Sequence, residues 1–296
     1  MEPVRAKAKS FQVIAHRGVC THADDQRIAP ENTIPAFEEA QRLGAAIELD
    51  VMTTADGLVV VHHDFELGRI FALPGKTQAV NEIPWAVLQT ATLNVEGHEE
   101  SVNKKLTSES AYTTPAQFRQ VRIPTLEAVL DAVPDTHVYI ELKARDGDAN
   151  ASLQLEAQVA KLIQEKNLYH RVTVISFSVR SLRKIKRLDP QIQTGLNVDV
   201  PRMIKRFPLV LPLWMRWYVK QWVGADSLQP SYDDTTLALV RAAHGAGLSI
   251  ISWVKHQTRD EEAALFSTLM RMGVDGLMTN AVDLLLQELE KQGKSG

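Results

Sequence analysis

Two pairs of ionisable residues lie two positions apart in short apolar runs. Glu48 and Asp50 belong to the run AIELDVM, and Glu141 and Lys143 belong to the run VYIELK. Side chains at positions i and i+2 of a strand point to the same face. If both runs are strands, each pair shares a face, and three carboxylates and one ammonium group can converge where the strands meet.

Three converging carboxylates predict a bound cation, because they would otherwise repel one another. Hard oxygen ligands favour Mg²⁺ or Ca²⁺. Zn²⁺ is less expected, since the chain has one cysteine, Cys20, and no histidine-rich spacing. We therefore predict one divalent cation, Mg²⁺ or Ca²⁺, with Glu48, Asp50 and Glu141 as its ligands. The structural alternatives are a solvated strand edge and a surface ion pair.

Basic and imidazole side chains follow other apolar runs. Arg17 and Lys143 beside a metal would form an anion site, because arginine binds phosphate bidentately and lysine adds a point charge. One of His16 and His63 could act as the general base and the other as the general acid, since imidazole titrates near neutral pH. A lone histidine at a strand end is more often structural, so only the joint pattern favours catalysis. His62 and His63 are adjacent and face opposite ways, so at least one is expected to be structural.

The elements that position these residues alternate between short apolar runs and amphipathic stretches. We predict strands at 11–15, 46–52, 58–62, 138–142, 171–177, 193–196, 224–228, 248–253 and 274–278, and helices at 34–43, 125–132, 152–166, 178–188, 234–244, 261–272 and 281–291. Strands separated by helices imply parallel βαβ units. About eight such units predict an α/β protein with a closed (β/α)₈ TIM barrel, and a doubly wound sheet is the alternative. Barrel enzymes place their sites at the carboxyl ends of strands, where the residues above fall.

The length of 296 residues fits one barrel domain with an insertion, since a barrel needs about 250 residues. The long polar stretch 66–121 breaks the alternation, and we interpret it as an insertion on the barrel rim. Hydrophobic content of 45% and charged content of 23% are those of a globular protein. The net charge of −3 gives no argument for a nucleic-acid partner.

No segment of the sequence resembles a signal peptide or a transmembrane span, and a single cysteine excludes an intrachain disulfide. A cytoplasmic location is therefore expected.

The segment Pro201–Val223 mixes aromatic and basic residues, which suits a membrane interface. We predict peripheral membrane contact or acyl-chain binding through it, and a rim helix packed on the barrel is the alternative. Phe177 and Trp253 end strands, where they either line the substrate pocket or pack the barrel top.

Several motifs carry a family resemblance. The runs AHRG, APENT, ELDV, VHHD, RIPTLEAVL, IELK, ISFS and GVDGLMTN occur in this order along most of the chain. Together they resemble the glycerophosphodiester phosphodiesterase family, although HRG or PENT alone would be weak signals. The resemblance implies a barrel that hydrolyses glycerophosphodiesters to an alcohol and sn-glycerol 3-phosphate. It also implies that a neighbouring substrate hydroxyl attacks phosphorus first, so that no serine or cysteine nucleophile is needed.

The resemblance implies a role for each matching residue. His16 and His63 correspond to the acid/base pair, and Arg17 and Lys143 to phosphate-binding groups. The implied metal ligands are Glu48, Asp50 and Glu141, and the implied supports of the His16–Arg17 loop are Glu31 and Asn32.

Four positions depart from the family pattern: Gly68, Ile70, His256 and Asn280. They bear on the leaving group rather than on the reaction. A lysophospholipase D acting on lysophospholipids is therefore an alternative, and a related transferase toxin is another that the lack of a signal peptide and disulfides disfavours. An inactive barrel that serves as a binding protein is the alternative of another class. The oligomeric state stays open.

Overall fold

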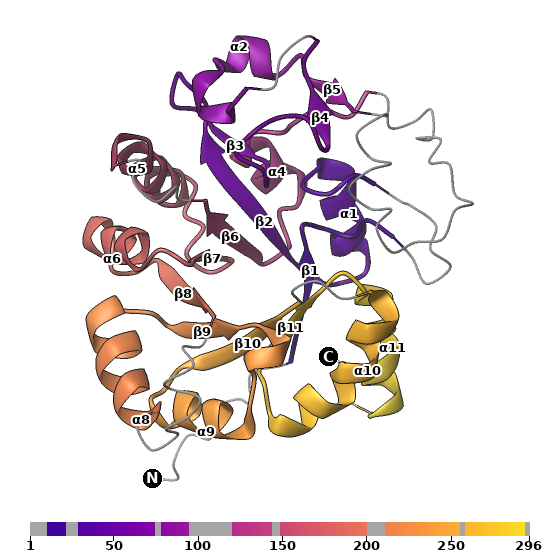
Figure 1. Ribbon diagram of the computed structural model, residues 1–296, viewed down its shortest axis with the longest axis vertical. Coiled ribbons are helices and arrows are strands. Elements are labelled where there is room, and N and C mark those ends of the chain that lie inside the picture. Colours follow the sequence, from indigo (N-terminus) through magenta and orange to yellow (C-terminus); the bar gives the residue numbers. More distant parts are fainter. Residues whose placement is uncertain are drawn as a thin grey trace.

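The computed structural model describes residues 11–21, 29–74, 78–94, 120–143, 149–199, 211–254 and 258–293. Eight parallel strands form the wall of a closed barrel (Figure 1). They are β1 (Gln12–His16), β2 (Ala46–Thr53), β6 (Val138–Leu142), β7 (Val172–Ser176), β8 (Gln193–Val198), β9 (Ser227–Pro230), β10 (Ser249–Trp253) and β11 (Gly276–Thr279). The barrel closes because β1 pairs with both β2 and β11. The predicted (β/α)₈ TIM barrel is thus confirmed.

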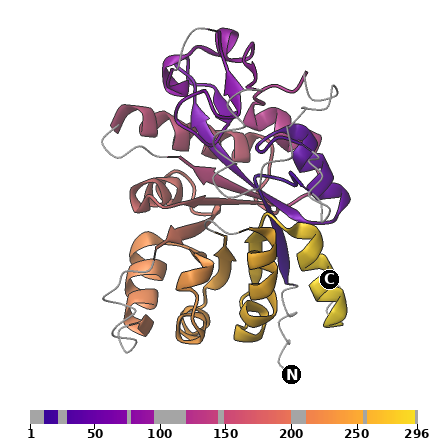
Figure 2. The ribbon, with the colours of Figure 1, turned by 45° about the vertical axis from the view of Figure 1, so that its right-hand side comes forward.

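Helices surround the barrel wall in both ribbon views (Figures 1 and 2). They are α1 (Ile34–Arg42), α4 (Leu126–Ala132), α5 (Ala149–Glu165), α6 (Val179–Leu188), α8 (Leu211–Leu213), the π-helix η4 (Trp214–Val223), the short η5 (Tyr232–Asp234), α9 (Leu237–Gly245), α10 (Arg259–Met272) and α11 (Val282–Lys291). Local signals set their ends. Thr258 and Glu261 form a capping box at the start of α10, and Gly273 ends it with a φ of 87°.

No helix in the described ranges is both long and apolar enough to cross a bilayer. The cytoplasmic location expected from the sequence stays a prediction.

The predicted strand 58–62 is not a parallel strand of the barrel, and that expectation is wrong. The short β3 (Val59–Val61) pairs antiparallel with the end of β2, with Val51 opposite Val61. Between them the chain turns at Gly57, whose φ is 82°. A connection this short permits only an antiparallel hairpin, whereas a parallel pair needs a long crossover. The apolar run itself carries no information on direction. The hairpin returns the chain to the barrel mouth, where the N–H of His62 donates to the carbonyl of Asp50 at 2.9 Å.

The chain after β3 forms small elements at the barrel rim. They are β4 (Phe71–Ala72), the 3-10 helix η1 (Val80–Glu82), α2 (Trp85–Leu88) and β5 (Thr92–Leu93). Phe71, Ile83 and Leu88 are buried in a hydrophobic cluster separate from the main core. Parts of the predicted insertion 66–121, namely 75–77 and 95–119, lie outside the described residues.

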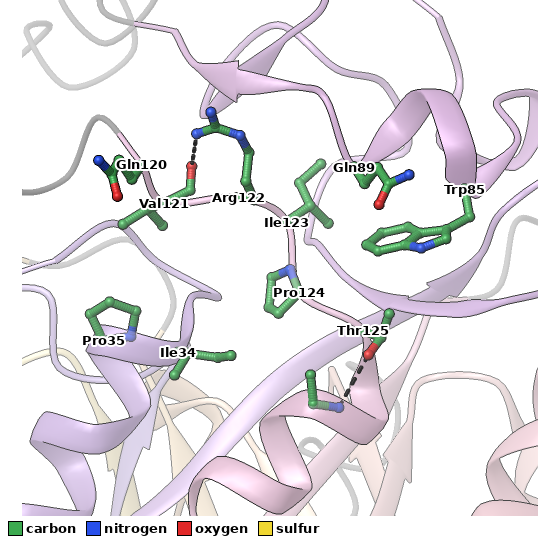
Figure 3. A pocket seen from close by; sticks show the side chains of 11 residues that line it. Ile34, Pro35, Trp85, Gln89, Gln120, Val121, Arg122, Ile123, Pro124 and Thr125 are labelled. Atoms are coloured by element: carbon green, nitrogen blue, oxygen red, sulfur yellow. Dashed lines mark hydrogen bonds between the residues drawn. The ribbon is translucent and has the colours of Figure 1, made fainter.

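A cavity of about 510 Å³ lies where the rim elements meet α1 and α4 (Figure 3). Its walls include Ile34, Trp85, Val121 and Ile123, and Thr125 at its edge caps α4 by accepting a hydrogen bond from the N–H of Ala128 at 3.1 Å. None of the predicted site residues lines this cavity.

A small apolar layer inside the barrel supports the site. Ile14 on β1 and Tyr139 on β6 are buried there with Ile175, Ile251 and Met278. Because residues two apart on a strand share a face, His16 follows Ile14 on the inner face and Glu141 follows Tyr139. The period-two pattern thus places both polar side chains one layer nearer the barrel mouth.

Candidate active site

The three predicted metal ligands converge inside the barrel mouth. Asp50 on β2 lies in register with Glu141 on the neighbouring β6. One carboxylate oxygen from each of Glu48, Asp50 and Glu141 lies within 4.8 Å of the others. The exposed fractions of the three residues are 1%, 1% and 9%. Hard oxygen donors at this spacing can share one divalent ion with ligand distances of about 2.0–2.6 Å. The residues present therefore fit a metal.

The three carboxylates of the cluster repel one another. Burial and the charges of Asp50 and Glu141 raise the pKa of Glu48 well above its usual value. Burial, with the charge of Asp50, also raises the pKa of Glu141. Burial acts the same way on Asp50, but Lys143 and Arg17 outweigh it and hold its pKa below the usual range. A bound cation would relieve the repulsion that raises the first two pKa values.

Both predicted phosphate-binding cations lie against this cluster. The Lys143 Nζ is 2.9 Å from Oδ1 of Asp50 and 2.7 Å from Oε1 of Glu141. The Arg17 Nε is 3.3 Å from Oδ2 of Asp50. Positive charge is therefore present beside the carboxylates, where an anionic phosphate could be held.

A tight loop after β1 aims Arg17 at the cluster. Arg17 has a φ of 59°, an uncommon left-handed conformation for a non-glycine residue. In this conformation its backbone N–H donates to Oε2 of Glu48 at 3.1 Å. Gly18 follows with a φ of 86°, and a Cβ there would lie 2.7 Å from the Cβ of Ala36. Glycine is required at this position because the loop packs directly on α1.

Asn32 and Glu31 contact this loop and the cluster. The Asn32 amide donates to Oδ2 of Asp50 at 2.9 Å and accepts from the N–H of Asp50 at 3.2 Å. Its backbone N–H donates to the carbonyl of Arg17 at 3.0 Å. Glu31 accepts a hydrogen bond from Nη1 of Arg17 at 3.0 Å. These contacts fix the positions of Asp50 and Arg17 together.

His16 is held by a residue from the other end of the chain. Its Nδ1 lies 3.0 Å from Oδ1 of Asn280, just after β11. The Asn280 amide donates through Nδ2 to Oε1 of Glu262 at 2.9 Å, and its backbone N–H donates to Oε2 at 3.0 Å. The amide oxygen therefore faces His16, so Nδ1 carries the proton and Nε2 carries the lone pair. Burial and the charge of Arg17 lower the pKa of His16 to about 4, which keeps it neutral at pH 7.

His63 has an acidic partner of its own. Its Nδ1 lies 2.7 Å from Oδ1 of Asp64. The other oxygen of Asp64 accepts from Nε of Arg69 at 2.6 Å, and Arg69 also donates to Glu31 at 2.6 Å. Burial would raise the pKa of Asp64, but hydrogen bonds from His63 and Arg69 outweigh it and lower that pKa. Asp64 is therefore an ionised acceptor that orients the His63 ring through Nδ1 and leaves Nε2 for the substrate.

The neighbouring His62 faces away from this pair. It is 2% exposed and its ring packs edge-on against Phe71 at 6.1 Å. This agrees with the expectation that one of the two adjacent histidines is structural.

Four site residues received no role from sequence reasoning: Asn197, Glu262, Asn280 and Arg69. Asn197 on β8 donates through Nδ2 to Oε2 of Glu141 at 3.0 Å, and no group in the described part of the chain hydrogen-bonds to its buried Oδ1. The available signals were weak. Asn197 lies just beyond the predicted strand 193–196, and Asn280 stood out only as a departure from the family motif.

The two predicted aromatic site residues meet at the strand ends. Phe177 and Trp253 pack edge to face with ring centroids 5.7 Å apart. The Trp253 Nε1 donates to the carbonyl of Gln229 at 2.9 Å, whereas Phe177 is 47% exposed. His256 lies outside the described residues.

The site opens to solvent beside the hairpin. A cavity of about 470 Å³ at this position is lined by His63, Asp64, Phe65, Glu66 and Lys143.

The single cysteine, Cys20, is half-buried in the loop after Gly18.

The chain belongs to the glycerophosphoryl diester phosphodiesterase family, whose sequence pattern matches residues 16–284. It is 30% identical to a glycerophosphodiester phosphodiesterase of Caldanaerobacter subterraneus subsp. tengcongensis over 95% of this chain and 98% of the relative. A Bacillus subtilis glycerophosphodiester phosphodiesterase is also 30% identical, over 92% of this chain and 84% of the relative. The enzyme class is that of phosphoric diester hydrolases.

Solved structures share the fold. One from Silicibacter pomeroyi superimposes with a TM-score of 0.77 at 22% identity, covering 98% of this chain and 96% of the other. A phosphodiesterase of Oleispira antarctica in complex with the product sn-glycerol-3-phosphate gives a TM-score of 0.69 at 20% identity, covering 94% and 96%. At these identities the likeness concerns the barrel itself.

Proposed function

We propose that this chain hydrolyses glycerophosphodiesters to an alcohol and sn-glycerol 3-phosphate with the help of one divalent cation, Mg²⁺ or Ca²⁺. The observation that carries the proposal is the buried cluster of Glu48, Asp50 and Glu141, with Arg17 and Lys143 beside it. When bound, the cation would polarise a phosphoryl oxygen and stabilise transition-state charge.

The two histidines divide the proton transfers. The neutral His16 accepts, at Nε2, the proton of the substrate hydroxyl next to the phosphodiester, and that oxygen attacks phosphorus. The bond to the leaving alcohol breaks, and its oxygen takes the proton from Nε2 of His63. The product is a cyclic phosphate. In the second step His63 takes a proton from water, the water oxygen attacks phosphorus, and His16 returns its proton to the released ring oxygen.

The hydrogen-bond partners support this division. Asn280 is a neutral acceptor for Nδ1 of His16. Burial and the charge of Arg17 lower the pKa of His16, so its ring is neutral and can accept a proton. Asp64 is an ionised acceptor that holds Nδ1 of His63, so Nε2 of that ring is the atom that exchanges protons with the leaving alcohol and with water. Arg17 and Lys143 hold the phosphate, and Glu31 and Asn32 maintain the loop geometry.

A second substrate class is a lysophospholipid, which would make the chain a lysophospholipase D. The edge-to-face pair of Phe177 and Trp253 favours it, because Phe177 is 47% exposed and gives the strand ends an apolar surface. We propose that this pair contacts the apolar part of the substrate. An inactive binding barrel is disfavoured, since both histidines and all three carboxylates are present and brought together.

The test measures sn-glycerol 3-phosphate released from glycerophosphocholine and choline released from lysophosphatidylcholine, with and without EDTA. We expect EDTA to abolish turnover and added Mg²⁺ or Ca²⁺ to restore it. His16→Ala should lower kcat by about 10²–10⁴-fold. His244→Ala is the matched control, because this histidine lies at the exposed end of α9 and pairs with Asp275. Turnover that survives both EDTA and His16→Ala would overturn the proposal.

A further inference from the structure

Helix η4 exposes a row of large aromatic side chains. Trp217 is 64% exposed, Trp222 49% and Tyr218 37%, and Leu213 before them is 62% exposed. Trp214 stacks on Tyr218 with centroids 6.0 Å apart, and Tyr218 stacks on Trp222 at 5.1 Å. The wide turn of a π-helix places residues four or five apart on one side, which gathers these rings.

The opposite face of η4 is anchored in the protein. Met215, Val219 and Val223 are buried in the main core. The helix therefore cannot turn to bury its indoles without losing this packing. Several large apolar side chains exposed together on one helix indicate an interaction site.

Exposed arginines border the aromatic row. Helix α6 lies beside η4 (Figure 1), and Arg180, Arg183 and Arg187 on it are exposed, as is Arg216 on η4. The guanidinium carbon of Arg183 lies 4.4 Å from the centroid of the Trp222 ring. None of these four arginines forms an ion pair with a described residue.

Three lysines described in this region have acidic partners, and two of them share one carboxylate. Lys186 and Lys220 pair with Asp226 at 2.8 and 3.3 Å, and Lys184 lies 3.6 Å from Glu156. The unpaired charge here is therefore positive, although the whole chain carries a net charge of −3. This local excess is complementary to an anionic surface.

We propose that this aromatic–arginine face, formed by Leu213, Trp217, Tyr218, Trp222, Arg180, Arg183, Arg187 and Arg216, docks on the surface of an anionic lipid bilayer. Indole and phenol rings partition into the headgroup region of a bilayer. Guanidinium groups pair with lipid phosphates, and anionic lipid attracts each nearby cation. The exposed aliphatic Leu213 favours hydrocarbon over stacked bases, so a bilayer fits this face better than a single-stranded nucleic acid.

This docking is independent of the hydrolytic reaction and is tested by binding alone. The full chain is sedimented with vesicles of phosphatidylcholine, with or without added phosphatidylglycerol, while its tryptophan fluorescence is recorded. We expect binding and a blue shift only with phosphatidylglycerol, weakening as salt is added. Each of Arg183→Gln and Arg187→Gln should weaken binding about fivefold, and the double variant Trp217→Ser/Trp222→Ser should lose the blue shift.

Matched controls come from α9, where Leu237 and Arg241 are exposed. Leu237→Ser and Arg241→Gln should bind vesicles like the wild type. All variants should keep their thermal unfolding midpoint and their turnover of soluble diester. If the wild type does not bind phosphatidylglycerol vesicles, or the α6 and η4 variants bind as it does, the proposal is wrong. Self-association lost in those variants, without vesicle binding, would assign the face to a second copy instead.

Discussion

His16 and Asn280, 264 positions apart in the chain, meet at 3.0 Å between Nδ1 and Oδ1. Because Glu262 holds the amide of Asn280 in a single orientation, the contact selects one tautomer of His16. The lone pair on Nε2 is thereby reserved for the substrate.

Asn280→Leu should therefore lower kcat by roughly 10- to 100-fold, a cost typical of losing an orienting partner, with little change in KM. Asn280→Asp keeps an acceptor and adds negative charge, so it should restore part of kcat and raise the pKa of His16. Steady-state kinetics as a function of pH check this. For the wild type, the pKa of about 4 means that His16 loses its role as base only as the pH falls through that value. A wild-type kcat in the Asn280→Leu variant would show that Asn280 has no role in the mechanism.

Asn197 on β8 contacts the proposed metal ligand Glu141. Its Nδ2 donates to Glu141 at 3.0 Å, so Asn197→Leu should weaken divalent-cation affinity by about 10- to 100-fold. Calorimetric titration with Mg²⁺ and Ca²⁺ measures the loss without reference to turnover. Gln229→Leu is the matched control, because Gln229 is the register partner of Asn197 on β9 and is also a buried amide. Equal losses in the two variants would show a general packing effect rather than positioning of Glu141.

Metal binding should release protons. Burial and the charges of Asp50 and Glu141 raise the pKa of Glu48, so more of it is protonated at a given pH than an exposed carboxyl. A cation must displace that proton. Below the raised pKa, apparent affinity should fall about tenfold per pH unit, and it should level off above it. Titrations in two buffers with different ionisation enthalpies count the protons. A binding enthalpy that is the same in both buffers on the acidic side contradicts the expectation.

Gly18 should tolerate no side chain. Its φ of 86° is strained for alanine, and a Cβ would lie within 2.9 Å of backbone atoms of Ala36. Gly18→Ala should lower the free energy of unfolding by roughly 3 kcal/mol and reduce activity through the His16–Arg17 loop. Gly44→Ala is the control, because Gly44 also has a positive φ but nothing within 4 Å. It should cost only about 1 kcal/mol and leave activity intact. Denaturant unfolding compares the two.

The sequence by itself determined the class of fold and the chemical identity of the site. Alternating strands and helices imply parallel units because each apolar face must be buried, and eight such units close a barrel. The spacing of Glu48 and Asp50 placed both carboxylates on one face, since side-chain direction in a strand follows from local geometry alone. The ordered motifs then indicated the family.

The tertiary structure alone decided which partner each of these side chains has. The contact of Asn280 with His16 and the hydrogen bond from Asn197 to Glu141 join residues far apart in the chain. Such contacts depend on strand register around a closed barrel and on the loops that cross its mouth. A period-two pattern records which face a residue occupies, and it contains no information about which neighbour stands opposite.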